Sequence, residues 1–194
     1  MATVKMFYDL ETTGLNPKLH SIHQIAGMFE VDGVIVERFN FKTKPHPKAQ
    51  IEAAALRIGG VTAEQIQSYP DMIDVYRDFS KMIGKYVLVE DRSDGIYLCG
   101  YNNRKFDDVF LLAWFQQNKD ELFFARFRTE SLDVEVLAAE YLLDRRRDMP
   151  SFKLKRVAME VGLEVDTDRL HDGEYDVQLT YDIYKIVTRR VIEL

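Results

Sequence analysis

Carboxylate side chains gather in three short stretches of the chain, and a histidine accompanies the last of them. These side chains are Asp9 and Glu11 in FYDLE, Asp107 and Asp108 at the end of GYNNRKFDD, and His171 and Asp176 at the ends of HDGEYD. Two carboxylates a few ångströms apart repel each other by roughly 4 kcal/mol at an effective dielectric constant of about 20. A cation relieves that repulsion, and Mg²⁺ and Mn²⁺ prefer oxygen ligands. The three stretches are therefore candidates for a divalent metal site.

In the first stretch, Asp9 and Glu11 lie two residues apart, which places both side chains on one face if the segment is a strand. The sequence TTGL follows, a turn whose backbone could approach a ligand closely. The spacing alone has low specificity, since roughly five such pairs are expected by chance from 32 acidic residues among 194. The apolar strand before this pair and the turn after it distinguish it from the others.

The second stretch follows an apolar segment that ends at Tyr101, passes through a polar loop and reaches two acids at the start of a predicted helix. Open mixed sheets commonly bind ligands at the ends of their strands. An aspartate at a helix start is also the usual N-cap, so metal binding and capping are both open. Asp107 and Asp108 each share a helical stripe with apolar residues, and periodicity does not decide between them.

The third stretch offers a group that titrates near neutrality, because the His171 imidazole can take a proton from water. His171 and Asp176 are five residues apart, which on one continuous helix would separate them by roughly 140°. They can converge only if His171 precedes the helix, in a loop that Gly173 helps to shape. An exposed loop histidine can equally be inert.

A set of strands and helices must position these residues. Alternating and apolar segments predict strands at 3–11, 24–31, 34–41 and 96–101, the second and third forming a hairpin around Asp32 and Gly33. Residues 131–143 indicate a strand end that leads into a helix, and residues 145–150 indicate an exposed loop. Further helices are predicted at 49–58, at a capping box of Thr62 and Gln65, and at 70–85, 106–117, 151–161 and 175–191. This order predicts an α/β fold, with a mixed sheet covered by helices on both faces.

The composition bounds the class of protein. A chain of 194 residues with 46% hydrophobic residues predicts one globular domain, residues 1–194. Its net charge of −6 argues against binding nucleic acid by bulk electrostatics, although metal ions would invert the field locally. A single cysteine, Cys99, excludes an internal disulfide framework. The longest apolar run, residues 109–115, is far shorter than the roughly 20 residues that span a bilayer, and we expect a cytoplasmic protein.

Taken together and in this order, the three stretches resemble the motifs of the DEDDh family, the DnaQ-like 3′-5′ exonucleases. FYDLETTGL is similar to the first motif, NNRKFD to the second and HDGEYD to the third. The similarity is strongest to the nuclease domain of bacterial exonuclease I, whose second motif resembles GYNNRKFDD almost throughout and which has a segment similar to PSFKL, residues 150–154, ahead of its third motif. The resemblance covers nearly the whole chain.

The resemblance implies an RNase H-like fold with a five-stranded mixed sheet flanked by helices. It implies two divalent ions, Mg²⁺ or Mn²⁺, and a histidine general base, His171. The family places its second-motif metal ligand directly after the phenylalanine, which selects Asp107 and leaves Asp108 as a cap or a supporting neighbour. The implied metal ligands are Asp9, Glu11, Asp107 and Asp176, and the implied substrate-binding residues are Thr12, Thr13, Gly14, Leu15, Asn102, Asn103 and Phe106.

The implied function is removal of nucleoside 5′-monophosphates from the 3′ ends of single-stranded nucleic acid, with DNA favoured over RNA. Two alternatives remain: an exoribonuclease or oligonucleotide scavenger, and a proofreading-type subunit that acts only with a partner polymerase. A non-catalytic binding module is disfavoured, because none of the five implied catalytic residues is lost. Gly173 stands where the family usually has alanine, and Glu174 adds a carboxylate nearby. A group of basic residues could line a strand path or form a solvated face: Arg104, Lys105, Arg145, Arg146, Arg147, Lys153, Lys155 and Arg156.

Overall fold

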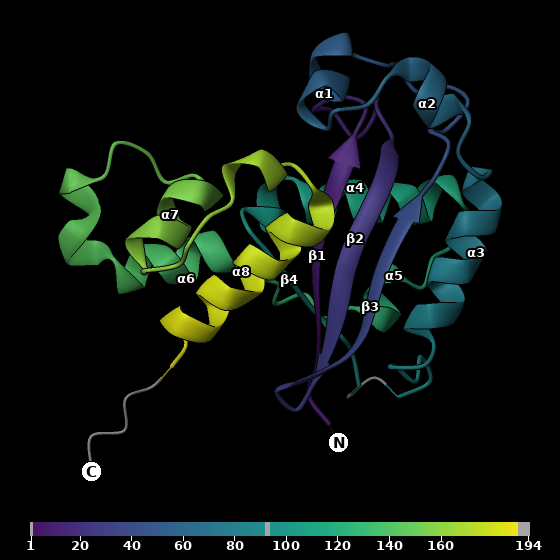
Figure 1. Cartoon of the computed structure of the whole chain (residues 1–194). Coiled ribbons are helices and arrows are strands. Elements are labelled where there is room, and N and C mark those ends of the chain that lie inside the picture. Colours follow the sequence, from purple (N-terminus) through teal and green to yellow (C-terminus); the bar gives the residue numbers. More distant parts are fainter. Residues whose placement is uncertain (1, 92–93, 190–194) are drawn as a thin grey trace.

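A five-stranded mixed sheet forms the centre of the computed structural model, which describes residues 2–91 and 94–189 (Figure 1). The strands are β1 (Val4–Thr12), β2 (Ile22–Val31), β3 (Val34–Lys42), β4 (Tyr97–Gly100) and β5 (Leu132–Asp133), in the order β3-β2-β1-β4-β5. β2 pairs antiparallel with β1 and β3, whereas β4 runs parallel to β1 and β5. The predicted fold class, a five-stranded mixed sheet with flanking helices, is confirmed.

Most helices lie at predicted positions with shorter bounds, whereas α8 begins two residues earlier than predicted and α5 was not predicted. They are α1 (Ala53–Ile58), α2 (Ala63–Gln67), α3 (Met72–Ile83), α4 (Asp107–Gln117), α5 (Phe123–Arg126), α6 (Val134–Tyr141), α7 (Leu154–Glu160) and α8 (Gly173–Val187). Three short 3-10 helices join them: η1 (Asn103–Lys105), η2 (Leu143–Asp148) and η3 (Thr167–Arg169). The predicted capping box of Thr62 and Gln65 opens α2. The predicted last helix extends to residue 191, which lies outside the described residues.

The segment predicted as an exposed loop at residues 145–150 is instead mostly helical, because η2 covers its first part. The reason is the burial of Met149, which packs with Leu142 and Val157 in the cluster beneath α6, α7 and α8. Leu142 and Met149 are buried at the two ends of a short polar run, and the residues between them therefore form a tight turn. The arginines of η2 remain exposed, as predicted.

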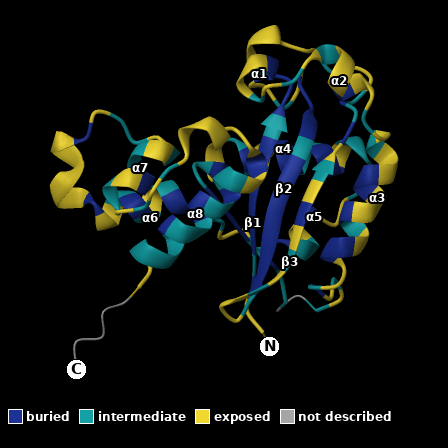
Figure 2. Cartoon of the chain, viewed as in Figure 1, coloured by how far each residue is buried: buried dark blue, intermediate teal, exposed yellow. Residues whose placement is uncertain are grey.

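Alternate residues of β1 face opposite sides of the sheet and meet different helices. Tyr8 and its like-facing neighbours pack into the main core, with Phe79 of α3 and Phe110 of α4. Phe7 faces the other way, and its ring meets the edges of Tyr181 and Tyr184 of α8 at centroid distances of 5.1 and 5.0 Å. Figure 2 shows the central strands largely buried between these two layers. Because Asp9 and Glu11 share the alternation of Phe7, they point toward the side of the sheet that α8 covers.

The sheet opens near the end of β1. The pairing of β1 with β4 is confined to residues 5–7 of β1, opposite Tyr97 to Cys99, although β1 continues to Thr12. Past Phe7, the β4 side of β1 therefore has no strand partner among the described residues. β1 and β4 are parallel, and the space beyond the carboxyl ends of such strands is where open sheets bind ligands. In residues 2–91 and 94–189, no helix is long and apolar enough to cross a membrane.

Candidate active site

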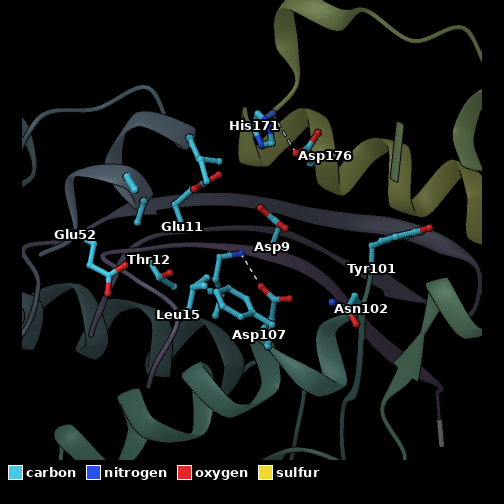
Figure 3. Close-up of a pocket in the computed structure, with 15 residues that line it drawn as sticks. Asp9, Glu11, Thr12, Leu15, Glu52, Tyr101, Asn102, Asp107, His171 and Asp176 are labelled. Carbon is cyan, nitrogen blue, oxygen red and sulfur yellow. Dashed lines mark hydrogen bonds between the residues drawn. The ribbon is translucent and has the colours of Figure 1, made fainter. Parts of the chain in front are cut away.

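A pocket of about 330 Å³ lies where β1 and β4 separate (Figure 3). All five residues predicted to be catalytic line it: Asp9, Glu11, Asp107, His171 and Asp176. They come from β1, from the start of α4 and from the start of α8 with the loop before it. The fold thus brings together three stretches that are far apart in the sequence.

The ionised forms of the two β1 carboxylates are destabilised, because both groups are largely shielded from water and lie near other acids. Burial, with the negative charges of Asp107, Glu11 and Asp176, raises the pKa of Asp9 well above its usual range. Burial, and then the charge of Asp176, raises the pKa of Glu11 to about 7. Both shifts favour any ligand that supplies positive charge to this face of β1.

Asp107 is fixed by the opening in the sheet. Its Oδ1 accepts a hydrogen bond of 3.1 Å from the backbone N–H of Leu10, which is free because β4 pairs only as far as Phe7. Burial and the neighbouring charge of Asp108 raise the pKa of Asp107, although the Leu10 hydrogen bond opposes the shift. Asp107 is therefore a buried carboxylate whose position depends on the β1 backbone.

Asp108 has a different surrounding and does not line the pocket. Its Oδ1 accepts hydrogen bonds from the Tyr8 hydroxyl at 2.5 Å and from Nδ2 of Asn103 at 2.9 Å. Asp108 thus ties β1 and the loop after β4 to the start of α4, behind the pocket. It makes no N-capping hydrogen bond for α4, so the expectation of a cap is wrong and that of a supporting neighbour fits the geometry.

His171 lies before α8, as the spacing of the third stretch requires. Its backbone adopts a positive φ of 69°, and its N–H donates to Oδ2 of Asp176 at 3.2 Å. Asp172 caps the helix by accepting from the N–H of Glu174 at 3.1 Å. Figure 3 shows the His171 ring and the Asp176 carboxylate on the rim opposite Asp107. The remaining oxygen of Asp176, Oδ1, is buried with no hydrogen-bond partner among the described residues.

Glycine at position 173 fits the close approach of α8 to the sheet. A Cβ there would lie 3.2 Å from Cβ of Ala26 and 3.8 Å from Oδ2 of Asp9. An alanine would therefore press on β2 and shift the start of α8 by a few tenths of an ångström. The departure from the family's usual alanine is accommodated by a tighter contact between helix and sheet.

The pocket fits divalent ions by its donor chemistry. The five carboxylates in its wall, Glu52 included, supply only oxygen ligands, and no lysine or arginine of the described segments lines it. A cation would partner the free Oδ1 of Asp176, which no described residue bonds, and would offset the burial that raises the pKa values of Asp9 and Asp176. As they stand, no three such side chains in residues 2–91 and 94–189 are close enough together to enclose an ion.

Four of the seven predicted substrate-binding residues line the pocket: Thr12, Leu15, Asn102 and Phe106. Leu15 is 76% exposed at the pocket. Asn102 adopts a positive φ of 59° and donates its backbone N–H to Asp133 at 2.9 Å, so it shapes the turn as well.

The structure does not place Thr13, Gly14 and Asn103 in the pocket wall. The Thr13 hydroxyl points inward and donates to a backbone carbonyl at 2.7 Å. Gly14 lies against the ring of His20, where a Cβ would come within 2.5 Å. Asn103 is fully buried, and its Nδ2 donates to Asp108 and to a serine hydroxyl. These three residues build the loops behind the pocket, and their expected contact with substrate stays a prediction.

Sequence reasoning missed Tyr101 on one side of the pocket and, on the opposite side, a wall formed by Glu52 and residues of α1. Glu52 lies 3.1 Å from Nε2 of His20, whose Nδ1 accepts the N–H of Asn16 at 3.0 Å and so leaves the proton on Nε2. Glycine after α1 allows the end of this helix to approach Glu11 of β1 closely, since a Cβ on Gly59 would lie 3.0 Å from Oε2 of Glu11. The pair Gly59-Gly60 was the available signal, because glycine permits close backbone approach.

Comparison with known proteins gives consistent results. The model of the exonuclease family RNase_T matches residues 6–184. The PolC-type DNA polymerase III of Oceanobacillus iheyensis is 27% identical over 186 residues, and that of Bacillus subtilis is 34% identical over 82 residues. These alignments cover 95% and 42% of the chain but only 11% and 6% of the two polymerases. The chain thus spans a small part of the relatives it matches.

Solved structures of Escherichia coli exonuclease I share the fold. The zinc-bound complex of that enzyme with single-stranded DNA has a TM-score of 0.77 and 23% identity, covering 96% of this chain and 40% of that one. Its complex with a dT13 oligonucleotide has a TM-score of 0.75 and 22% identity, covering 97% and 41%. The predicted RNase H-like fold and the predicted resemblance to DnaQ-like exonucleases are confirmed.

Proposed function

Since the chain belongs to the exonuclease family RNase_T, we propose that it is a metal-dependent 3′-5′ exonuclease that degrades single-stranded DNA to nucleoside 5′-monophosphates. The observation that supports this most is the convergence of four carboxylates and one histidine on a single pocket at the carboxyl ends of two parallel strands. Escherichia coli exonuclease I, which has the same fold, has been solved with single-stranded DNA.

Asp9, Glu11, Asp107 and Asp176 are the side chains that would hold two divalent ions, Mg²⁺ or Mn²⁺. Such ions, when bound, activate the attacking water and stabilise the attacking and leaving oxygens at phosphorus. The residues of the chain set the geometry: the Leu10 N–H orients Asp107 at 3.1 Å, and the His171 N–H orients Asp176 at 3.2 Å. Asp107 and Asp176 each keep the second carboxylate oxygen for a ligand.

His171 is the proposed general base. Its backbone is held by Asp176, while its side chain is exposed on the rim of the pocket and can reach a water beside the scissile phosphate. An imidazole accepts that proton near neutral pH. Because His171 sits on a loop and not on the helix, its ring can approach the phosphate from the side opposite Asp107.

The 3′-terminal nucleotide is proposed to lie between Leu15 and α1. Leu15 exposes 76% of its surface at the pocket, and Ile58 of α1 exposes 58%. Apolar side chains that meet the face of a base bury apolar surface, a contact that does not depend on which base is present. Thr12 and Phe106 line the pocket between this apolar end and the carboxylates.

The test is digestion of a 5′-labelled single strand with Mg²⁺ or Mn²⁺, alongside a matched RNA strand and a strand with a blocked 3′ end. We expect a ladder that shortens from the 3′ end of the DNA, release of 5′-monophosphates, and no reaction in EDTA. Absence of shortening with both metals would refute the proposal. Faster digestion of the RNA strand would instead assign an exoribonuclease or oligonucleotide scavenger.

A proofreading role with a partner polymerase is the second candidate, and the similarity to PolC-type polymerases favours it. In this case the domain would act on the 3′ end that a polymerase presents. Activity that appears only after addition of a purified replicative polymerase, and preferential removal of mismatched 3′ nucleotides, would distinguish this role from independent degradation of single strands.

A further inference from the structure

A basic segment extends from η2 into α7, in a chain whose net charge is −6. Within residues 145–156 it carries six cationic side chains and one acid, Asp148. The cationic side chains are Arg145, Arg146, Arg147, Lys153, Lys155 and Arg156. Such a local excess in an acidic protein requires either internal partners or an anionic ligand.

Three of these cations serve the segment itself. Arg145 and Arg156 both bind the carboxylate of Glu160, the second at 2.8 Å. Arg146 lies over the ring of Phe152 with its guanidinium carbon 5.2 Å from the centroid, and it donates to the carbonyl of Met149 at 3.3 Å. These contacts tie η2, the loop after it and α7 into one braced unit.

The other three cations, Arg147, Lys153 and Lys155, point to solvent. All three are exposed, and in the described part of the chain none of them forms an ion pair. The braced unit thus presents three positive charges that no ion pair among the described residues neutralises. Two large apolar side chains of the same elements are at least half exposed, Leu143 at 65% and Met159 at 50%.

The basic segment is continuous with the pocket. Tyr101 lines the pocket, and its hydroxyl donates to the backbone carbonyl of Phe152 at 2.6 Å, directly before Lys153. Figure 3 shows Tyr101 on the side opposite Glu52 and Leu15, with the carboxylates between. With the scissile phosphate at the carboxylates and the 3′ nucleotide against Leu15, the rest of the strand must leave past Tyr101.

We propose that the basic segment binds the backbone phosphates of a single-stranded nucleic acid, on the 5′ side of the nucleotide being removed. The inference rests on the proposed function, and it assigns Arg147, Lys153 and Lys155 to phosphates beyond the pocket. A groove of positive charge that follows the backbone is a general feature of single-strand binding sites, and the exposed Leu143 and Met159 add apolar surface that bases can cover. An acidic and apolar peptide has related chemistry, but the continuity through Tyr101 favours the strand.

The test compares R147Q/K153Q/K155Q with a control, K48Q/K81Q/K119Q, which removes three exposed lysines elsewhere and causes the same change in net charge. Each protein is assayed at fixed Mg²⁺ on a single strand of about 15 nucleotides and on the p-nitrophenyl ester of thymidine 5′-monophosphate, which has no upstream phosphate. For the long strand, the first variant should lose kcat/KM through KM, by an amount on the order of 50-fold at 0.15 M salt if all three side chains contact phosphate. The slope of log kcat/KM against log salt concentration should fall by about 2.

Neither triple variant should change hydrolysis of the ester, and the control should retain both KM and salt slope on the strand. Equal losses by the two variants, or losses of the same size on ester and strand, would overturn the proposal. Unchanged cleavage of the strand together with loss of binding to an acidic apolar peptide would overturn it in favour of a protein partner. Failure of the wild type to cleave either substrate would refute the proposed function. The proposal for the basic segment would then be tested by comparing the affinity of the wild type and of the two triple variants for the single strand.

Discussion

Replacing Glu11 by glutamine should stabilise the metal-free protein at alkaline pH and remove its activity. Burial, followed by the charge of Asp176, raises the pKa of Glu11 from 4.5 to about 7. Between these values the folded protein holds a proton that the unfolded chain has lost, so stability falls as pH rises through this window. The penalty is complete above pH 7 and absent well below pH 4.5. Glutamine cannot ionise, and Glu11 accepts no side-chain hydrogen bond that it would lose among the described residues.

The difference between the two pKa values corresponds to roughly 3 kcal/mol. Glu11 is only partly buried, and solvent in the open pocket screens its charge, which lowers the figure to about 2 kcal/mol. For a chain of this length, a gain of that size raises Tm by roughly 4 to 8 °C. The gain should be largest near pH 8 and small near pH 5.

Scanning calorimetry in EDTA at the two pH values measures the effect, and repetition with Mg²⁺ should reverse it, because the wild type gains more from the ion than the variant does. Glu37→Gln is a control of opposite sign: hydrogen bonds from Lys85 and Tyr86 lower the pKa of Glu37, so its removal should destabilise the protein at pH 8. If Glu11→Gln unfolds at or below the wild-type temperature at pH 8 in EDTA, or if its gain does not vary with pH, the electrostatic reasoning is wrong.

Three further predictions concern the pocket. Asp107→Asn should lower kcat roughly a thousandfold in a strand-digestion assay, since several kcal/mol of transition-state stabilisation is lost. Asp108→Asn should retain activity within about tenfold but lose about 2 kcal/mol of stability in urea unfolding, because the groups that donate to Asp108 lose a charged partner. The reverse ranking would show that the alignment of the second motif is wrong by one residue. His171→Gln should lower kcat by about 10² to 10⁴ with little change in Mg²⁺ affinity measured by calorimetry, and a rate near wild type would exclude the residue as the base. Gly59→Ala brings a methyl group within 3.0 Å of the Glu11 carboxylate, so Mg²⁺ affinity should fall about tenfold while Tm changes little, and an unchanged affinity would count against this contact.

Local patterns were sufficient to predict most of the fold. Alternation along β1, the Asp32-Gly33 turn and the capping box of α2 are encoded within a few residues, and each appears where expected. The exceptions include α5, which was not predicted, and η2, where helix formation depends on the burial of Met149 against residues of α7. That contact joins segments that no local pattern connects.

The candidate site was predictable to the extent that it lies in motifs. Residue types and order identified the acids and His171, but only the resemblance chose Asp107 over Asp108. The physical difference between them is long-range: the Leu10 N–H is free for Asp107 because β4 stops pairing at Phe7, whereas Asp108 turns toward Tyr8. Neither fact is contained in the helical periodicity of α4.

Adjacency to a motif was a poor guide to the pocket wall. Thr13 and Gly14 are neighbours of lining residues, yet their roles are to hold the loop against residues such as His20. Conversely, Glu52 lies far from every motif in the sequence and reaches the pocket because its backbone N–H pairs with the carbonyl of Thr13 at 2.8 Å. Prediction of such a wall requires knowledge of which loops pack together.

The hydrogen bond between the Leu10 N–H and Asp107 gives the protein a built-in spectroscopic reporter. An amide proton that bonds to a carboxylate has a chemical shift that follows the charge of that carboxylate, and Leu10 is buried, so bulk solvent contributes little to its signal. In an isotope-labelled sample, a single backbone resonance should therefore move when Asp107 loses its proton or gains a cation. Occupation of the pocket could be followed at one atom, with no substrate and no attached label.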